Sequence, residues 1–374
     1  MPGGSPRFPI LLLARELEAG GSERQLAETA LGLDRSRFDP YVGTFRPHSA
    51  RADQLRAAGI PVIHFPVYSF RSRGALVGAW RLARFIRAKK IQLVHTFDAP
   101  LTAFATPVVR YLTRALMVSS QRGHRQITPE YARLLRWTDR RVDGIVVNCQ
   151  FLKRYLIEEE HVAERLVRVS YNGIDLETFS PGGAERPASL PTDSLVIGVA
   201  CVLRPEKGLG TLIDAFARVR TLSPHMKLVL VGSGSELLAL QERARTAGIF
   251  EDCVWQPHTA DVVAWLRNFD VFVLPSLSEG LSNSLMEAMA CGCAAIASNA
   301  GGNPELIGSG RGLLFESGDA SSLAAALARL IQDPDLRQRL GTQARRFVRE
   351  NFSRETAAGH MGEIYESFLD KRRS

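Results

Sequence analysis

The sequence predicts an α/β protein of two doubly wound, Rossmann-like domains, and two observations carry this prediction. Short apolar runs alternate with segments of helical period, an order typical of parallel sheets covered by helices on both faces. At 374 residues, the chain also exceeds one ordinary domain of about 100 to 200 residues. Its composition, 45% hydrophobic and 23% charged, suits a globular protein with a sizeable core.

The first half of the chain reads as a series of strands separated by helices. The strands are expected at 9–14, 41–45, 62–65, 91–97, 115–120, 144–149 and 167–172, and the clearest helices at 22–33, 75–90 and 149–159. Parallel strands need a long crossover between them, and a helix usually supplies it. The alternation therefore predicts a parallel sheet in this half.

Residues 181–194, rich in Pro, Gly and Ser, interrupt the alternation and indicate a linker. We expect an N-terminal domain at 1–188, a second domain at 189–351 and a final helical segment at 352–374. In the second domain, strands are expected at 195–203, 226–232, 253–257 and 270–276, with helices at 209–220, 236–248 and 260–268. Ligands of such sheets bind beyond the carboxyl ends of the strands, so a cleft between two facing domains is the expected site.

The net charge of +8 is concentrated in the first half, where 28 Lys and Arg stand against 18 Asp and Glu in residues 1–188. Such an excess favours an anionic partner, including an anionic membrane surface, although a solvated arginine-rich face explains it equally well. The basic runs lack a recognisable nucleic-acid reader motif or interleaved aromatic residues, so no nucleic-acid partner is expected.

The cysteines and the hydropathy pattern point to a cytoplasmic protein. The five cysteines are odd in number and form no C-x-x-C pair, which argues against a disulfide framework and a zinc site. No apolar run approaches the roughly 18 residues that a membrane-spanning helix needs, and we predict neither a span nor a signal peptide.

Three loops after predicted strands are candidates for binding an anion. Gly20 and Gly21 precede a helix in which Ser22 and Gln25 have capping-box spacing, so helix N-terminal amides would face the cleft. Arg204 and Lys207 lie three positions apart in a short loop and can converge on a diphosphate. Gly232 begins a weak glycine pattern. For each loop, an ordinary turn or a solvated loop remains the alternative.

The stretch SLSEGLSNSLMEAMACG, residues 276–292, carries two glutamates around a predicted helix start. Ser284 and Glu287 have capping-box spacing, which places Glu287 in the first helical turn and Glu279 in the preceding loop. Each carboxylate suits a pair of sugar hydroxyls, and the helix N-terminus between them suits a phosphate. The simpler alternative is that Glu287 only caps its own helix and Glu279 is solvated.

These residues resemble the retaining glycosyltransferases of family four, which have the GT-B fold and an E-x7-E motif, here Glu279 and Glu287. The resemblance spans nearly the whole chain because further motifs follow in the family's order. They are Gly20–Glu23, Asn172–Asp175 with Phe179, Arg204–Gly208, Gly232–Gly234 and Gly301–Ile307.

The resemblance implies a role for each matched residue. Arg204 and Lys207 would hold the donor's diphosphate, Glu287 the ribose and Glu279 the transferred sugar, while Gly21 would approach the phosphates from the other domain. Gly232 also falls on the donor side. The backbone around the helix start would bind the sugar and the distal phosphate; its residues are Gly280, Leu281, Ser282, Asn283, Ser284 and Leu285. The family needs no divalent metal and no other cofactor.

The acceptor side departs from the family's pattern. Many relatives carry a His directly before a Gly near the transferred sugar, and here Arg122 occupies that place. His124 follows two positions later and either reaches the sugar or faces solvent. Asp98 and His95 are candidates for lining the acceptor pocket, although His95 is equally compatible with a buried strand position.

The resemblance implies retaining transfer of a hexose-type sugar from a nucleoside diphosphate sugar, with UDP favoured and GDP next. The acceptor would be a lipid-linked or saccharide hydroxyl in cell-surface polysaccharide or glycolipid synthesis, and the basic N-terminal domain would rest on the inner face of the plasma membrane. The final segment would pack on the first domain. A sugar-nucleotide epimerase of the same fold remains the alternative function.

Overall fold

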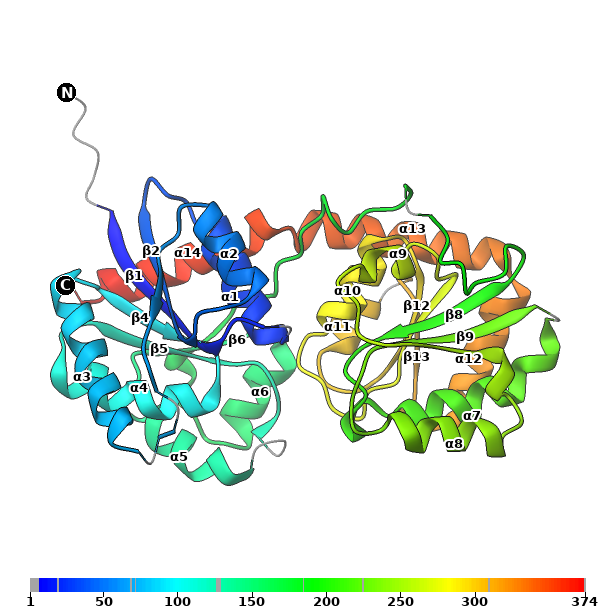
Figure 1. Ribbon diagram of the computed structural model, residues 1–374, viewed down its shortest axis with the longest axis horizontal. Coiled ribbons are helices and arrows are strands. Elements are labelled where there is room, and N and C mark those ends of the chain that lie inside the picture. The colour runs from blue at the N-terminus through cyan, green and yellow to red at the C-terminus, as the bar shows by residue number, and fades with distance from the viewer. Residues whose placement is uncertain are drawn as a thin grey trace. The chain divides into compact units, whose positions relative to one another are not determined.

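The computed structural model describes residues 7–372 except 19, 68, 71, 126–128, 184, 224 and 309, and only the backbone of 129–131. The chain forms two compact units (Figure 1). The first unit runs to Gly173 and resumes at Arg354, whereas Ile174–Ser353 form the second. The two-domain α/β prediction is confirmed.

The first unit is built on a parallel sheet with strand order β3-β2-β1-β4-β5-β6-β7. Its strands are β1 (Phe8–Glu16), β2 (Phe38–Arg46), β3 (Val62–His64), β4 (Leu93–Thr96), β5 (Leu116–Gln121), β6 (Gly144–Val147) and β7 (Val167–Val169). The central strands are buried, as expected for a sheet covered on both faces. All seven expected strands are present.

Helices lie on both faces of this sheet, with α1, α2 and α14 on one face and α3, α4 and α5 on the other (Figure 1). The helices are α1 (Gly21–Gly32), α2 (Ala50–Ala57), α3 (Arg73–Ala88), α4 (Ala99–Leu112), α5 (Pro129–Asp139), α6 (Gln150–Glu158) and α14 (Arg354–Asp370). The last of these belongs to the first unit's core, since Met361, Tyr365 and Phe368 pack with Ile10 and Leu26.

The second unit has a parallel sheet with strand order β10-β9-β8-β11-β12-β13. Its strands are β8 (Leu195–Ala200), β9 (Met226–Val231), β10 (Cys253–Gln256), β11 (Val271–Leu274), β12 (Ala294–Ser298) and β13 (Leu313–Phe315). The strand order reverses between β8 and β11, so the loops that follow these strands leave the sheet side by side. Such a switch point is where open α/β sheets bind ligands.

The helices of the second unit also cover both faces of its sheet (Figure 1). They are α7 (Leu209–Val219), α8 (Leu237–Thr246), α9 (Val262–Leu266), α10 (Asn283–Ala290), α11 (Asn303–Ile307), α12 (Ala320–Gln332) and α13 (Pro334–Asn351). Apolar side chains of α7 and α12 share one core with β8, β9 and β11. This core holds the strands whose carboxyl ends carry the candidate site.

The units divide between Gly173 and Ile174, whereas the sequence placed the boundary at 188/189. The N–H of Ile174 donates to the carbonyl of Phe352, and Phe179 is buried. In addition, Arg267 Nε donates to the carbonyl of Ser180 at 2.6 Å. These contacts hold 174–180 in the second unit, so the Pro- and Gly-rich composition marks a surface loop of that unit rather than the division itself.

Across the described ranges, none of the helices combines the length and apolar character needed to cross a bilayer.

Candidate functional site

Lys207 and Glu279 form an ion pair at the carboxyl edge of the second sheet. Lys207 Nζ lies 2.7 Å from Glu279 Oε2, and both side chains are largely buried, at 21% and 15% exposed. Burial lowers the pKa of Lys207, but the adjacent Glu279 carboxylate outweighs it, so the pKa is raised and the ammonium stays charged. The structure thus joins two predicted site residues that lie on different loops.

Arg204 and Lys207 share the loop after β8 but have different surroundings. Arg204 precedes the 3₁₀ turn Pro205–Lys207, and its side chain is 62% exposed, with Glu206 no nearer than 4.0 Å. Lys207 points to Glu279 instead. Both cations leave the same strand end; Lys207 is buried in a close ion pair, whereas Arg204 is exposed and only loosely paired.

Gly208 allows the β8 loop to approach the β11 loop. It has φ +61°, and a Cβ added there would lie 2.3 Å from the carbonyl oxygen of Pro275. A larger residue would have to push the two loops apart. The N–H of Leu277 also donates to the carbonyl of Glu206 at 2.8 Å, which fixes the register of the two loops.

The start of α10 differs in detail from the expectation. Ser282 is the N-cap, and its Oγ accepts from the N–H of Leu285 at 3.3 Å. The predicted capping box of Ser284 and Glu287 is therefore wrong. Helix counting from Ser282 puts Glu287 in the second turn, where its side chain is 3% exposed. Glu287 is thus not the cap, and Glu279 is paired and largely buried rather than solvated, so the simpler alternative is wrong.

The helix start is accessible on one side. Asn283 and Ser284 are half-buried, whereas Gly280, Leu281 and Leu285 are buried and anchor the turn in the core. The first N–H groups of a helix have no intrahelical partners and carry a partial positive charge, which suits an anion or a sugar oxygen. Ser282 satisfies one of these groups through its hydroxyl.

Gly232 follows β9, and its N–H donates to the carbonyl of Gln256 at 2.8 Å. An added Cβ at Gly232 would lie 1.9 Å from the carbonyl oxygen of Cys201, so this glycine lets the β9 and β8 loops touch. The structure gives Gly232 a packing role at the edge of the site.

Sequence reasoning missed a hydrogen-bonded chain beneath Glu279. Ser276 Oγ donates to Glu279 Oε2 at 3.0 Å. The carbonyl of Ser276 accepts from Ser298 Oγ at 2.6 Å, and Ser298 in turn receives a bond from Asn303 Nδ2 at 3.3 Å. Ser276 begins the quoted glutamate stretch, and Asn303 lies in the motif 301–307, so their positions next to recognised motifs were the available signal.

In the first unit, α1 begins at Gly21 with Gly20 as its N-cap, and the predicted capping box of Ser22 and Gln25 is wrong. Gln25 is buried and exchanges two hydrogen bonds of 2.8 Å with the backbone of Gly173. Gly21 itself is exposed at the helix start. The two motifs 20–23 and 172–175 are therefore brought together by Gln25 rather than by a cap.

Arg122 and His124 both pack against aromatic rings. The Arg122 guanidinium lies 5.0 Å from the centre of the Phe97 ring and donates to Asn172 Oδ1 at 2.6 Å, and burial lowers the pKa of Arg122 to about 10. His124 is half-buried, and its ring lies tilted against that of Tyr155 with 3.9 Å between ring centres.

Asp98 and His95 hold the fold around the carboxyl end of β4. Asp98 is the N-cap of α4, where Oδ1 accepts from the N–H of Leu101 at 2.8 Å, and it pairs with Arg15 at 3.1 Å. Burial raises the pKa of Asp98 despite these partners. His95 is fully buried between Tyr365 and Ser120, at 2.7 Å and 2.9 Å, which decides between its two predicted positions.

The chain matches two glycosyltransferase family models. Residues 19–178 match the model described as "Glycosyltransferase Family 4", and residues 184–347 match "Glycosyl transferases group 1". The two matches fall on the two halves of the chain that build the two sheets.

Curated relatives carry glycosyltransferase names. The lipopolysaccharide core biosynthesis mannosyltransferase LpcC of Rhizobium leguminosarum bv. viciae is 31% identical over 71% of this chain and 76% of its own. The capsular polysaccharide biosynthesis glycosyltransferase CapM of Staphylococcus aureus is 27% identical over 72% and 73%.

Solved structures share the fold at low sequence identity. Anabaena Alr3699/HepE in complex with UDP and glucose has a TM-score of 0.83 at 23% identity, covering 96% of this chain and 100% of its own. A glycosyltransferase from Rickettsia africae ESF-5 also scores 0.83, at 21% identity and 98% and 99% coverage. With two parallel α/β units, both family models and a relative of 31% identity, the chain belongs to the GT-B glycosyltransferases of group 1 and family 4.

Proposed function

We propose that this glycosyltransferase moves a hexose-type sugar from a nucleoside diphosphate sugar to an acceptor hydroxyl with retention of configuration. UDP is the favoured nucleoside diphosphate of the donor, and GDP is next. The observation that carries the proposal is the Lys207–Glu279 pair beside exposed Arg204 and the Ser282-capped start of α10. The mannosyltransferase name of one relative and the UDP and glucose bound in one similar structure agree with such a donor.

In the proposed reaction, the diphosphate is held by Arg204, Lys207 and the N–H groups at the start of α10. When the diphosphate binds, the Lys207 ammonium donates hydrogen bonds to both Glu279 and the phosphate. Glu279 then also accepts a hydrogen bond from a sugar hydroxyl. Glu287, buried in the second turn of α10, is assigned to the ribose. Protein cations and helix amides then neutralise the phosphates, so the reaction needs no divalent metal and no other cofactor.

The bond between the anomeric carbon and the phosphate oxygen breaks as the acceptor oxygen bonds to the same face of that carbon. The departing phosphate oxygen takes the acceptor's proton, so the products are the glycoside and a nucleoside diphosphate. Stabilising the leaving phosphate is the main catalytic task, and removal of one such electrostatic contact commonly costs on the order of 10²-fold in rate. We assign the acceptor to lipid-linked or saccharide hydroxyls in cell-surface polysaccharide or glycolipid synthesis.

The donor is found by measuring thermal stabilisation with a panel of UDP- and GDP-sugars, because a ligand at about 100 times its Kd adds roughly 2.7 kcal/mol. Transfer is then followed to lipid and saccharide acceptors, with the anomeric configuration of the product read by NMR. Glu279→Gln is expected to stop transfer and stay folded, while Glu242→Gln, an exposed glutamate of α8, is expected to remain active. Wild-type transfer by the Glu279 variant would refute the assignment.

An incubation with donor alone tests the epimerase alternative. Donor alone, without acceptor, is incubated with the protein, and a new sugar nucleotide would identify an epimerase. Hydrolysis or no change, together with transfer once acceptor is added, supports the glycosyltransferase.

A second proposal concerns where the enzyme acts, namely in the cytoplasm on the inner face of the plasma membrane. One exposed face of α3 combines apolar and basic side chains: Leu76 is 74% exposed and Trp80 57%, and Arg84 lies 5.2 Å from the centre of the Trp80 ring. Interfacial helices have this composition. Trp80→Ser is expected to weaken sedimentation with phosphatidylglycerol vesicles, whereas the exposed-site variant Leu238→Ser is expected to bind as wild type. Equal, salt-independent binding by both would refute the proposal.

A further inference from the structure

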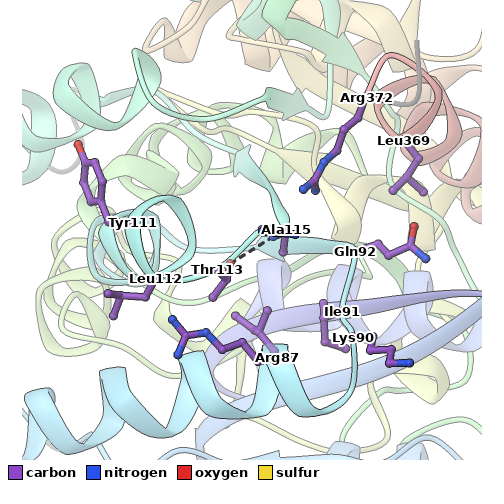
Figure 2. A pocket seen from close by; sticks show the side chains of 12 residues that line it. Arg87, Lys90, Ile91, Gln92, Tyr111, Leu112, Thr113, Ala115, Leu369 and Arg372 are labelled. Atoms are coloured by element: carbon purple, nitrogen blue, oxygen red, sulfur yellow. Dashed lines mark hydrogen bonds between the residues drawn. The ribbon is translucent and has the colours of Figure 1, made fainter.

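A hollow of about 770 Å³ lies at the amino ends of β4 and β5 in the first unit (Figure 2). Its walls come from the ends of α3, α4 and α14 and from the turns that lead into the two strands. Basic and apolar side chains line it. Asp98 and Arg122 follow the carboxyl ends of the same strands, so the hollow lies at the opposite edge of the first sheet from these two predicted acceptor-side residues.

Four of the lining side chains are cationic, namely Arg87, Lys90, Arg114 and Arg372, and the lining includes no Asp or Glu. Within the described parts of the chain, none of the four lies within ion-pair distance of a carboxylate. In Figure 2, Arg87 and Arg372 extend from opposite walls toward the turn at Thr113–Ala115. Unpaired like charges repel one another, and an anion between them would relieve that repulsion.

The ends of three helices meet at this hollow, and their dipoles favour cations there. Each helix carboxyl end is equivalent to roughly −0.5 charge, so three of them amount to about −1.5 against four full positive charges. The four cations therefore carry more positive charge than the three helix ends offset.

The remaining walls define the shape of the ligand. Tyr111 and Leu112 supply exposed apolar surface, whereas Leu369 belongs to the core behind it. The Thr113 hydroxyl is already engaged, since it donates to the Val109 carbonyl at 2.8 Å and accepts from the N–H of Ala115 at 3.2 Å. The open polar groups are therefore mainly guanidinium donors, whose planar forks match phosphate oxygens.

We propose that this hollow is a second ligand site of the protein, which binds a phosphate-bearing molecule through Arg87, Arg114 and Arg372 and packs its apolar part against Tyr111 and Leu112. Both a free phosphorylated metabolite and the headgroup of an anionic lipid present this chemistry. The site is separate from the donor site and does not depend on the proposed transfer reaction.

The test uses full-length Arg114→Gln/Arg372→Gln, because neither residue lies on α3. The matched control is Arg35→Gln/Arg165→Gln, two exposed arginines of the same unit that do not line the hollow. Circular dichroism and Tm establish that both variants are folded, and the single variants Arg114→Gln and Arg372→Gln serve if the double variant is not.

Pyrophosphate binding is titrated by calorimetry at low salt for the free-phosphate arm. Pyrophosphate also fits the proposed donor site, so each pair of substitutions is made in the Arg204→Ala/Lys207→Ala background as well. In that background, the hollow variant is expected to bind pyrophosphate about tenfold more weakly, because it has lost charge-assisted hydrogen bonds. The control pair is expected to leave pyrophosphate binding unchanged. Vesicles of phosphatidylglycerol in phosphatidylcholine give the lipid arm.

Weaker binding by the hollow variant than by the control, in either arm, supports the proposal and identifies the source of the phosphate. Equal binding of pyrophosphate and of vesicles by the two variants would overturn it. Neither outcome depends on sugar transfer, so failure of this proposal and failure of the proposed function are distinguishable.

Discussion

Lys207 Nζ lies 2.7 Å from Oε2 of Glu279, although the two residues are 72 positions apart in the sequence. The contact exists because the strand order sets the loops after β8 and β11 next to each other. It joins the proposed phosphate-binding cation to the carboxylate proposed for the sugar. Four predictions follow from this arrangement and from the buried polar groups that support the fold.

Lys207→Ala is expected to lower turnover by on the order of 10²-fold or more, because the leaving phosphate loses a cation. Lys227→Ala is the matched control, since Lys227 is also ion-paired and partly buried in the second unit, at 25% exposed. Steady-state rates and Tm are compared for both variants. Similar losses of turnover in the two would show that the effect is general rather than local to the site.

Ser276→Ala is expected to reduce turnover about tenfold by removing a hydrogen bond to the charged Glu279. The affinity for the nucleoside diphosphate alone should stay unchanged, because Ser276 acts through Glu279 rather than on the phosphates. Ser194→Ala, which removes a different partly buried hydrogen bond in the same unit, is the control. Parallel losses of nucleotide affinity and turnover would contradict a positioning role.

Gly208→Ala is expected to destabilise the second unit and impair turnover. The left-handed backbone conformation costs about 1 kcal/mol or more for a residue other than glycine, and the added methyl group would also meet the carbonyl of Pro275. Gly248→Ala carries only the first cost, since Gly248 has φ +68° and nothing within 4 Å of an added Cβ. Chemical denaturation and transfer rates separate the two costs, and equal results for both variants would count against the loop contact.

His95 is expected to make the protein less stable as the pH falls below about 6.5, the ordinary pKa of His. Burial beside Arg122 lowers the pKa of His95 well below that value in the folded protein, so the imidazole stays neutral there. The unfolded chain binds a proton that the folded protein does not. Stability is therefore fully present above pH 6.5 and is lost below it, by about 1.4 kcal/mol per pH unit until the folded pKa is reached.

Denaturation of His95→Asn and of wild type between pH 5 and 8 checks this dependence, because the variant should lose this component of the slope. His360→Asn removes an exposed imidazole and should keep the wild-type slope. A His95 variant with the wild-type slope would assign the acid sensitivity to other groups.

The local pattern of the sequence predicted much of the fold. The expected strands at 41–45 and 226–232 became β2 and β9, and the helix at 209–220 became α7, because apolar periodicity is a property of neighbouring residues. It failed where the decisive contact is long-range. The capping role expected of Gln25 was wrong because its amide bonds to Gly173, 148 positions away.

By itself, the sequence determined the two α/β units, the glycine-bearing loops at the strand ends and the resemblance to GT-B glycosyltransferases, of which the family matches confirmed the glycosyltransferase family. The tertiary structure decided that Lys207 pairs with Glu279, that Ser282 rather than Ser284 caps α10, and that the units divide at Gly173. The physical reason is that chain periodicity encodes which segments form strands and helices. Which of their ends meet depends on the order of strands in the sheet and on what the buried polar groups find as partners.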